Sequence, residues 1–453
     1  MQIHGFRDFL LELEKSDIRY VLLRKDLLSD APIKDLDVLI DPRQFTDFKR
    51  ITYAKGFFLI KDGYLNPGKK VFIRPCGTGS LLIDLHLEVV HRGLVFHDVR
   101  ICLERRQKRR GLFFLSDEDY LIALLFHNLL AKNRIQEKHA GDLRELLQKS
   151  LDEAYLQQQL HRFGLWAVFE AVRKDFELCV QDADFVAPLA QRARQSLEAT
   201  VPANRRRRRL IHRRRKWARF FGRKRGLVIA FIGPDGAGKS TTISAIQEYL
   251  NRLGLNTHVA YLGPWGGSLF HFKNRLKWLN VDPYREDYKA YYAGKLQQKP
   301  SPLPLLKQLK LAVRSAMYYP LLMIEMAARW YVRVLPRLRE GRVVLADRYI
   351  YDMLVGYKSR PMDYQVGVRR WLCRLYPRPD FGVLLDADPE VIYARKPQLR
   401  ASHLTLIRPL YRQVANQYGF VILDTGTSVE ATVQAFAERL TPDMLKRLQA
   451  KLD

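Results

Sequence analysis

The segment that most constrains the fold is residues 233–240, which read GPDGAGKS. It fits the pattern G-x-x-x-x-G-K-[ST] and lies between a continuous apolar run, residues 226–232, and a helical pattern over residues 241–253. A strand, a glycine-rich loop and a helix in this order turn backbone N–H groups toward bound phosphate oxygens. We therefore predict a phosphate-binding loop on an α/β scaffold. A chance glycine-rich turn is the alternative, and the agreement of strand, loop and helix disfavours it.

Three further apolar runs follow the loop, at residues 343–346, 381–385 and 420–423. Continuous apolar runs are typical of parallel strands that are covered on both faces, and helical segments separate these runs. The sequence therefore predicts a three-layer α/β/α fold with a mostly parallel sheet over residues 226–453.

The loop supplies a set of candidate nucleotide contacts, namely Gly233, Gly236, Ala237, Gly238, Lys239, Ser240 and Thr241. Lys239 can reach the β- and γ-phosphates of ATP, and the Ser240 hydroxyl can bind Mg²⁺. Asp347 directly follows the apolar run at residues 343–346, so its carboxylate is expected to orient the same metal ion or its water. A structural ion pair between Asp347 and Arg348 is the alternative.

The chain is strongly basic, with 77 Lys and Arg residues against 48 Asp and Glu residues and a formal charge of +29. This charge favours polyanionic partners or phosphate-bearing small molecules. Thirteen residues between 205 and 225 are basic, so residues 201–225 are predicted to form a basic linker or an exposed helix. The segment is either a solvated hinge or a contact with nucleic acid or inner-leaflet lipid. The interleaved apolar residues favour lipid slightly; they are Leu210, Ile211, Trp217, Phe220 and Phe221.

The residues before the linker show two patterns, strand-like runs first and helical spacing after them. Strand-like runs at residues 20–24, 36–40, 71–74 and 81–87 predict a small α/β domain over residues 1–115. Ser116 resembles a helix start, and helical apolar spacing follows it, which predicts a helical domain over residues 116–200.

Two features bear on location. The N-terminus lacks the apolar stretch of a signal peptide, and charges interrupt the apolar stretch at residues 312–335, which predicts an amphipathic helix. We therefore expect a cytoplasmic protein, attached peripherally to the inner membrane surface if the linker binds lipid. The four cysteines lie far apart and are expected to be reduced core thiols.

Three segments together resemble the thymidylate kinase family of P-loop kinases: GPDGAGKST at 233–241, ADRY at 346–349 and LLDADPEVIYARK at 384–396. The resemblance extends over about residues 226–440 and implies an ATP- and Mg²⁺-dependent kinase. It also implies that Asp347 and Arg348 align the metal, ATP and the acceptor phosphate, and that Asp235 lies near the acceptor.

A cationic stretch follows the predicted strand at 381–385. The family's basic lid over ATP corresponds here to Arg395, Lys396 and Arg400. Arg408 and Arg412 extend this stretch, and their charge could help to neutralise the transferring phosphoryl group. A solvated helix face is the alternative for these last two arginines.

Two segments differ from the thymidylate kinase pattern. The family usually has an Arg-Glu-Pro-Gly-Gly-Thr type segment whose arginine holds the acceptor nucleotide, whereas residues 262–268 here read LGPWGGS. After the ADRY segment, residues 350–357 read IYDMLVGY instead of the family's run beside thymine. The resemblance therefore supports the ATP side of the site but does not support dTMP as the acceptor.

A second resemblance covers roughly the first 115 residues. Residues 34–40 read KDLDVLI, and Asp84 lies on a later strand, which is similar to the carboxylates of polymerase β-type nucleotidyltransferases. This resemblance places Asp35, Asp37 and Asp84 at metal positions, and His86 would share the strand face of Asp84. The family's Gly-Ser loop is replaced by residues 23–27, LRKDL, so a domain that only binds is the alternative.

These patterns leave three hypotheses open. The preferred one is a P-loop kinase that transfers the γ-phosphoryl group of ATP to a small nucleotide, sugar or sugar-phosphate acceptor. The second is a nucleotidyltransferase that uses Asp35, Asp37 and Asp84, with the P-loop half as its nucleotide-binding partner. The third is a non-catalytic protein that binds an anionic surface and is switched by ATP.

Overall fold

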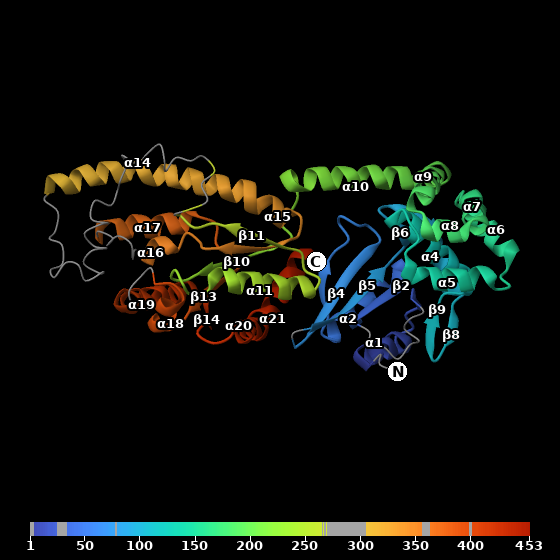
Figure 1. Ribbon diagram of the computed structural model, residues 1–453, viewed down its shortest axis with the longest axis horizontal. Helices are drawn as coiled ribbons and strands as arrows, with labels where there is room; N and C mark the ends of the chain where they lie inside the picture. Colours follow the sequence, from blue (N-terminus) through green and yellow to red (C-terminus); the bar gives the residue numbers. More distant parts are fainter. Residues whose placement is uncertain are drawn as a thin grey trace. The chain divides into compact units, whose positions relative to one another are not determined.

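The computed structural model describes residues 4–24, 34–77, 79–264, 266, 269, 305–355, 363–397 and 401–453 (Figure 1). Contacts divide the chain into two compact units, residues 1–217 with 452–453, and residues 218–451. The division falls inside the predicted basic linker, and the first unit includes both predicted N-terminal domains. The finer division at residues 115 and 200 stays a prediction.

In the described part of the C-terminal unit, five strands form a parallel sheet in the order β11–β12–β10–β13–β14. The strands are β10 (Leu227–Ile232), β11 (Thr257–Tyr261), β12 (Val343–Asp347), β13 (Phe381–Asp386) and β14 (Val421–Asp424). Every residue of the central strand β10 is buried, as its continuous apolar run predicts. The carboxyl ends of parallel strands meet at one edge, and the glycine-rich loop follows β10 there.

Helices cover both faces of this sheet, with α14, α15 and α17 on one side and α11, α20 and α21 on the other (Figure 1). The helices are α11 (Lys239–Arg252), α14 (Leu305–Arg329), a π-helical turn (Trp330–Val334), α15 (Leu335–Arg339), α16 (Asp352–Val355), α17 (Asp363–Leu375), α18 (Pro389–Arg395), α19 (Ala401–Tyr418), α20 (Val429–Arg439) and α21 (Thr441–Leu452). The described part of this unit is therefore a layered α/β structure, which agrees with the predicted fold class.

In the described part of the N-terminal unit, a seven-stranded mixed sheet has the order β3–β4–β5–β2–β1–β9–β8. Its strands are β1 (Tyr20–Leu22), β2 (Asp35–Ile40), β3 (Phe58–Lys61), β4 (Lys69–Cys76), β5 (Gly79–His86), β8 (Gln107–Arg109) and β9 (Leu112–Phe114). A separate ribbon pairs β6 (Val89–His91) with β7 (Leu94–His97). The parallel pair β2 and β5 matters for the site described below.

Side chains alternate between two hydrophobic clusters along the central strands of this sheet. Tyr20 and Val38 pack with α1 and α2, whereas Val21 and Leu39 pack with the helices that follow residue 116. The helices of this unit are α1 (His4–Lys15), a 3₁₀ turn (Pro42–Gln44), α2 (Phe45–Ala54), α3 (Val99–Glu104), α4 (Asp117–Lys132), α5 (Glu137–Gln148), α6 (Glu153–Arg162), α7 (Trp166–Lys174), α8 (Phe176–Gln181) and α9 (Ala183–Thr200).

The predicted basic linker is mostly helix α10 (Pro202–Phe221). Its basic block does not lie wholly outside the core, contrary to expectation. Ile211 is buried against Gly93, and the buried side chain of Asn204 donates to the Val95 carbonyl and accepts from the Val95 N–H. Helical spacing places these residues on one face, and that face of the helix packs against the N-terminal unit.

The strand predictions and the Ser116 helix start are confirmed. The Ser116 hydroxyl accepts from the Asp119 N–H and caps α4. The prediction for the cysteines is wrong for Cys76, which is exposed because it ends a strand, whereas Cys102, Cys179 and Cys373 are buried. In the part of the chain that the structure describes, none of the helices combines the length and apolar character that a bilayer-spanning segment requires.

Candidate active site

The glycine-rich loop adopts backbone conformations that favour glycine. Gly236 and Gly238 have φ angles of 94° and 74°. A Cβ atom at Gly236 would also lie 2.9 Å from Cγ2 of Ile392 in α18. Conformation and space together therefore fix this loop against α18, and Gly238 caps the N-terminus of α11. The loop carries Ala237, which is buried, and leads to Ser240 and Thr241, which are exposed.

Lys239 lies inside this loop and is almost completely buried. Its Nζ donates hydrogen bonds to the carbonyl oxygens of Gly233 and Pro234 at 3.0 and 2.6 Å. Burial, followed by the charge of Arg348, lowers the pKa of Lys239 to about 8. The cation is thus held where the pattern predicts phosphate binding.

Asp347 and Arg348 lie at the end of β12, the strand beside β10. Asp347 pairs in register with Phe231, the next-to-last residue of β10. Asp347 therefore lies at the end of the sheet from which the glycine-rich loop starts. Asp347 forms no ion pair with Arg348 or with another described residue. Arg348 instead bonds to Asp235 of the loop and, through Nη1, to Asp352 at 2.7 Å. Two predicted residues, Asp235 and Arg348, are therefore in direct contact.

Asp352 is a site residue that the sequence analysis missed. It lies in α16, is almost completely buried and anchors Arg348, whose φ angle of 66° is unusual for a side-chain-bearing residue. Burial raises the pKa of Asp352, and the Arg348 charge acts in the opposite direction. The i, i+4 spacing of Arg348 and Asp352 is the sequence signal that could have identified this pair.

Thr425, the residue after β14, contacts the glycine-rich loop. The Thr425 hydroxyl donates to the carbonyl oxygen of Ala237 at 3.0 Å and to that of Asp386 at 3.1 Å. Arg395, the predicted lid arginine, donates to the Thr425 carbonyl at 2.8 Å. Thr425 therefore connects the loop to the cationic stretch, a role that its short polar side chain gave no reason to predict.

The remaining lid residues have different placements. Lys396 is exposed, and Arg400 lies outside the described residues. Arg412 donates to the buried carboxylate of Asp386 at 2.6 Å, and Arg408 bonds to the same carboxylate at 2.9 Å. A buried strand-end carboxylate thus holds both arginines, and the two alternatives for them, phosphate neutralisation or a solvated helix face, stay predictions.

No protein-family model matches this chain. The chain is 27% identical over 222 residues to a probable thymidylate kinase from Pyrobaculum aerophilum, an alignment that covers 46% of this chain and 94% of that protein. It is 23% identical over 203 residues to a probable thymidylate kinase from Archaeoglobus fulgidus, covering 43% and 86%. A third, from Pyrococcus horikoshii, is 36% identical over 90 residues, which is 19% of this chain and 41% of that protein.

The chain contains a thymidylate kinase-like domain. The glycine-rich loop and the Asp347–Arg348 pair are two of the segments on which the resemblance to thymidylate kinases in the sequence rests. The similarities support a kinase-like nucleotide phosphotransferase, and the acceptor is a separate question because the sequence differs at residues 262–268.

The oxygen donors of the thymidylate kinase-like domain fit a magnesium ion. Ser240 is the second residue of α11, directly after the loop, and Asp347 ends the strand beside β10, so both residues lie at the carboxyl end of the sheet. Hydroxyl and carboxylate oxygens are the ligands that Mg²⁺ prefers, together with water and substrate phosphates. Both side chains retain exposure to solvent, which such a shared site requires.

A second cluster lies in the N-terminal unit, on the parallel pair β2 and β5. Asp37 stands directly beside Asp84 in register. Nε2 of His86 lies 3.7 Å from a carboxylate oxygen of Asp37 and 3.8 Å from one of Asp84. The third predicted carboxylate, Asp35, instead bonds to Arg24 at 2.8 Å. The structure thus brings together two of the three predicted carboxylates and the His86 imidazole.

The charges around this second cluster are mixed. Lys69 lies 3.9 Å from Asp84 and 3.3 Å from the His86 ring nitrogen. Burial is the largest single influence on the pKa of Asp37 and raises it. The His86 hydrogen bond and the charges of His86, Arg24 and Lys69 together outweigh burial, so this pKa lies below its usual value. Two carboxylates and an imidazole within 4.8 Å of one another suit a divalent cation, which would compete with the ammonium group of Lys69.

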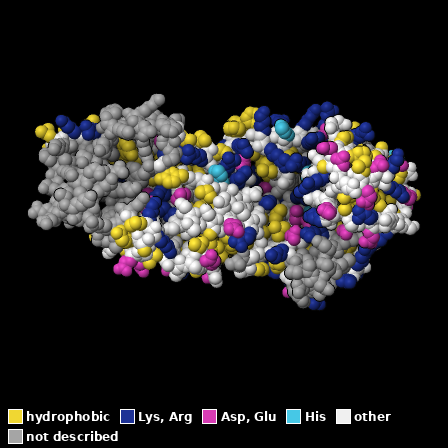
Figure 2. Space-filling view, viewed as in Figure 1, with side chains coloured by type: hydrophobic (Ala, Val, Ile, Leu, Met, Phe, Trp, Pro, Cys, Tyr) yellow, Lys and Arg dark blue, Asp and Glu magenta, His cyan; other side chains and the backbone are white. Residues whose placement is uncertain are grey.

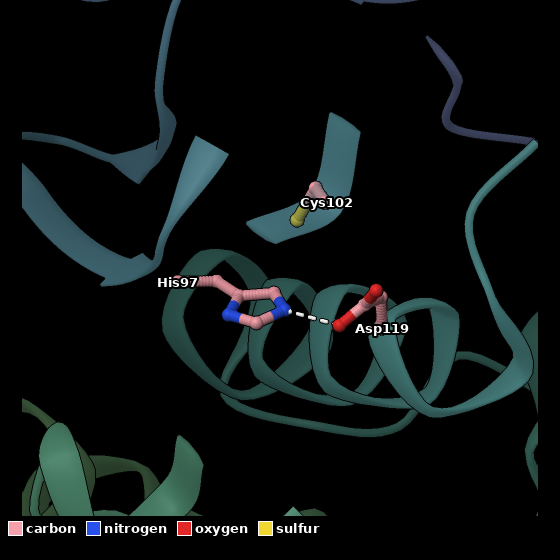
Figure 3. A group of neighbouring side chains, drawn as sticks. All are labelled: His97, Cys102 and Asp119. Carbon is pink, nitrogen blue, oxygen red and sulfur yellow. Dashed lines mark hydrogen bonds and ion pairs between the residues drawn. The ribbon is translucent and has the colours of Figure 1, made fainter. Parts of the chain in front are cut away.

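A third cluster, formed by His97, Cys102 and Asp119, is completely buried in the N-terminal unit (Figure 3). Nε2 of His97, at the end of β7, bonds to the Asp119 carboxylate of α4 at 2.7 Å. The hydroxyls of Tyr155 and Ser116 also donate to Asp119. Burial raises the pKa of the Cys102 thiol well above its usual value, which disfavours the thiolate that binds metals. This cluster is a hydrogen-bond network that joins β7, α4 and α6.

Proposed function

We propose that the C-terminal unit is an ATP- and Mg²⁺-dependent kinase that phosphorylates a small nucleotide, sugar or sugar-phosphate acceptor. The observation that carries this proposal is the linked set Lys239, Asp235, Arg348 and Asp352 at the loop. A buried lysine inside the loop and an anchored arginine beside it place two cations where a transferring phosphoryl group would pass.

In this proposal the residues act by position and charge. The loop N–H groups and Lys239 hold the phosphates, and Arg348 neutralises charge that develops between donor and acceptor. Asp352 keeps Arg348 in place, and Asp235 lies on the acceptor side of the same arginine. When bound, Mg²⁺ would be held by Ser240 and Asp347 and would neutralise charge on the phosphate oxygens.

The test is a screen of the purified chain for ADP formation from ATP in the presence of nucleoside monophosphates, sugars and sugar phosphates. Support requires ADP formation that depends on both Mg²⁺ and one acceptor class. Such turnover would also exclude the non-catalytic hypothesis. Binding of ATP with no acceptor-dependent turnover in any class would contradict the proposal.

We expect dTMP to be a poor acceptor, with kcat/KM below about 10⁴ M⁻¹s⁻¹, the lower end of the usual enzyme range. Residues 262–268 contain no arginine. The buried Arg329 of α14 is already engaged, because it donates to the Gly263 carbonyl at 2.8 Å and pairs with Glu325. Steady-state kinetics with dTMP and with the acceptor from the screen provide the measurement. Efficient dTMP turnover would show that another residue replaces the missing arginine.

The geometry of Asp37 and Asp84 favours nucleotidyl transfer in the N-terminal unit as a second candidate function. The variant Asp37→Asn distinguishes the two hypotheses, because it keeps the shape of the side chain and removes its charge. If the C-terminal unit is the kinase, this variant is expected to retain ADP formation within about twofold of wild type, because Asp37 belongs to the other compact unit and lies outside the proposed kinase site. Loss of the reaction in Asp37→Asn, together with full activity in a Lys239 variant, would instead assign catalysis to the N-terminal unit.

A further inference from the structure

The basic residues of α10 fall into two groups. One group faces the protein: Arg207 pairs with Glu88 at 2.6 Å, Arg215 bonds to Asn66 at 2.8 Å, and Arg208 pairs with Glu198. The other group is exposed and has no hydrogen bond or ion pair with any residue that the structure describes. We call it the outward face of α10, and it consists of Arg205, Arg206, Arg209, Arg213 and Lys216.

Helical geometry explains this sorting. Asn204, Ile211 and Ala218 are buried and recur every seven residues, which places them on one side of the helix. Arg206, Arg209, Arg213 and Lys216 recur at spacings of three and four residues on the opposite side. Docking of α10 therefore leaves a row of unpaired cations directed at solvent, and Figure 2 shows Lys and Arg side chains gathered along this helix.

An apolar stripe runs beside the outward face. Leu210, Trp217 and Phe221 have exposed fractions of 46%, 49% and 79%, and their spacing of seven and four residues aligns them along the helix. Phe220, with 61% exposed, adds a ring that lies 6.4 Å from that of Phe221. Exposed apolar side chains beside a row of cations are typical of helices that lie in a membrane interface.

We infer that the outward face of α10 docks on an anionic lipid surface, with the apolar stripe inserted between the headgroups. Like charges at i, i+4, such as Arg205 with Arg209 and Arg209 with Arg213, destabilise a helix in water. An anionic surface removes this repulsion and attracts each cation. The aromatic rings of the stripe could also stack on bases, but Leu210 could not. Lipid accommodates both kinds of apolar side chain beside the cations, so lipid suits the stripe better than nucleic acid does.

The test uses the full chain and vesicles of phosphatidylcholine with or without phosphatidylglycerol, in a co-sedimentation assay. Each basic residue near an anionic surface contributes about a fivefold increase in affinity. The triple variant Arg206→Gln/Arg209→Gln/Arg213→Gln is therefore expected to bind mixed vesicles about a hundredfold more weakly. The matched control is Lys132→Gln/Arg134→Gln/Lys138→Gln, which removes the same charge from exposed positions elsewhere in this unit and should bind like wild type.

A second variant separates lipid from nucleic acid. Leu210→Ser/Phe221→Ser removes no charge and is expected to weaken vesicle binding at least about tenfold, since each buried apolar side chain contributes to the affinity. Circular dichroism of every variant should match that of wild type. Equal binding by the triple variant and its control would overturn the inference. So would stronger binding of the wild-type chain to RNA or DNA than to mixed vesicles at the same salt concentration, because that result would assign the outward face to nucleic acid.

Discussion

Replacing Lys239 by methionine is expected to lower the rate of ATP-dependent phosphoryl transfer by at least about a hundredfold. In the structure, Nζ is enclosed by the carbonyls of Gly233 and Pro234 and lies 3.9 Å from Asp235. Methionine fills a similar volume but supplies no charge to the β- and γ-phosphates. Initial rates of ADP formation, measured with the acceptor found in the screen, provide the comparison.

The fold should survive this substitution, because methionine keeps most of the buried volume of the lysine side chain. Lys224→Met is the control, since Lys224 is exposed just before β10 and should retain wild-type turnover. If Lys239→Met kept more than about a tenth of the wild-type rate with an unchanged circular dichroism spectrum, the loop would not be the site of phosphoryl transfer.

The second large effect concerns stability rather than activity. Asp119→Ala is expected to destabilise the N-terminal unit by about 3–5 kcal/mol, the usual cost of removing one partner from a buried charged network. His97, Tyr155 and Ser116 would all lose their acceptor inside the core. Hydrogen–deuterium exchange of the α4 and α6 amides in the intact chain measures this loss of stability. These amides are expected to exchange at least about a hundredfold faster than in the wild-type chain.

Two comparisons sharpen this stability prediction. Glu170→Ala removes an exposed carboxylate from the same unit and should leave the exchange of α4 unchanged. Asp119→Asn keeps the size and one acceptor oxygen, so an intermediate effect is expected.

Burial tends to raise the pKa of Asp119, but the bonds from His97, Tyr155 and Ser116 lower it below its usual value. The carboxylate therefore stabilises the unit above about pH 4, and this contribution disappears as the pH falls through the lowered pKa. An unchanged exchange rate in Asp119→Ala would show that the network contributes little.

The parts of the fold that the sequence predicted are those with a local cause. The apolar run of β10 and the glycine-rich loop after it are recognisable because every residue of β10 is buried and the loop requires glycine at positions such as Gly236. Asp347 was found in the same way, from its place at the end of an apolar run. The edge strand β11 was missed, because Thr257–Tyr261 has an apolar pattern too short and too mixed to stand out.

The unpredicted parts of the sites depend on contacts between distant segments. Thr425 acts on a loop that lies 188 residues earlier, and no local pattern distinguishes it from other strand-end threonines. In the N-terminal unit the sequence identified Asp37 and Asp84, but the parallel pairing of β2 with β5 decides which groups meet. Arg24 pairs with both Asp35 and Asp37, at 2.8 and 3.6 Å, and a short D-x-D pattern carries no information about such pairs.

The hydrogen bond from Thr425 to Ala237 also has a consequence for how the protein is made. Translation proceeds from the N-terminus, and the glycine-rich loop leaves the ribosome long before β14 does. Until Thr425 has emerged, the Ala237 carbonyl lacks the hydroxyl that holds it, and Arg395 lacks the carbonyl that it binds. A nascent chain that already displays GPDGAGKS therefore still lacks the hydroxyl that holds Ala237, and the loop reaches its final arrangement only after Thr425 has emerged.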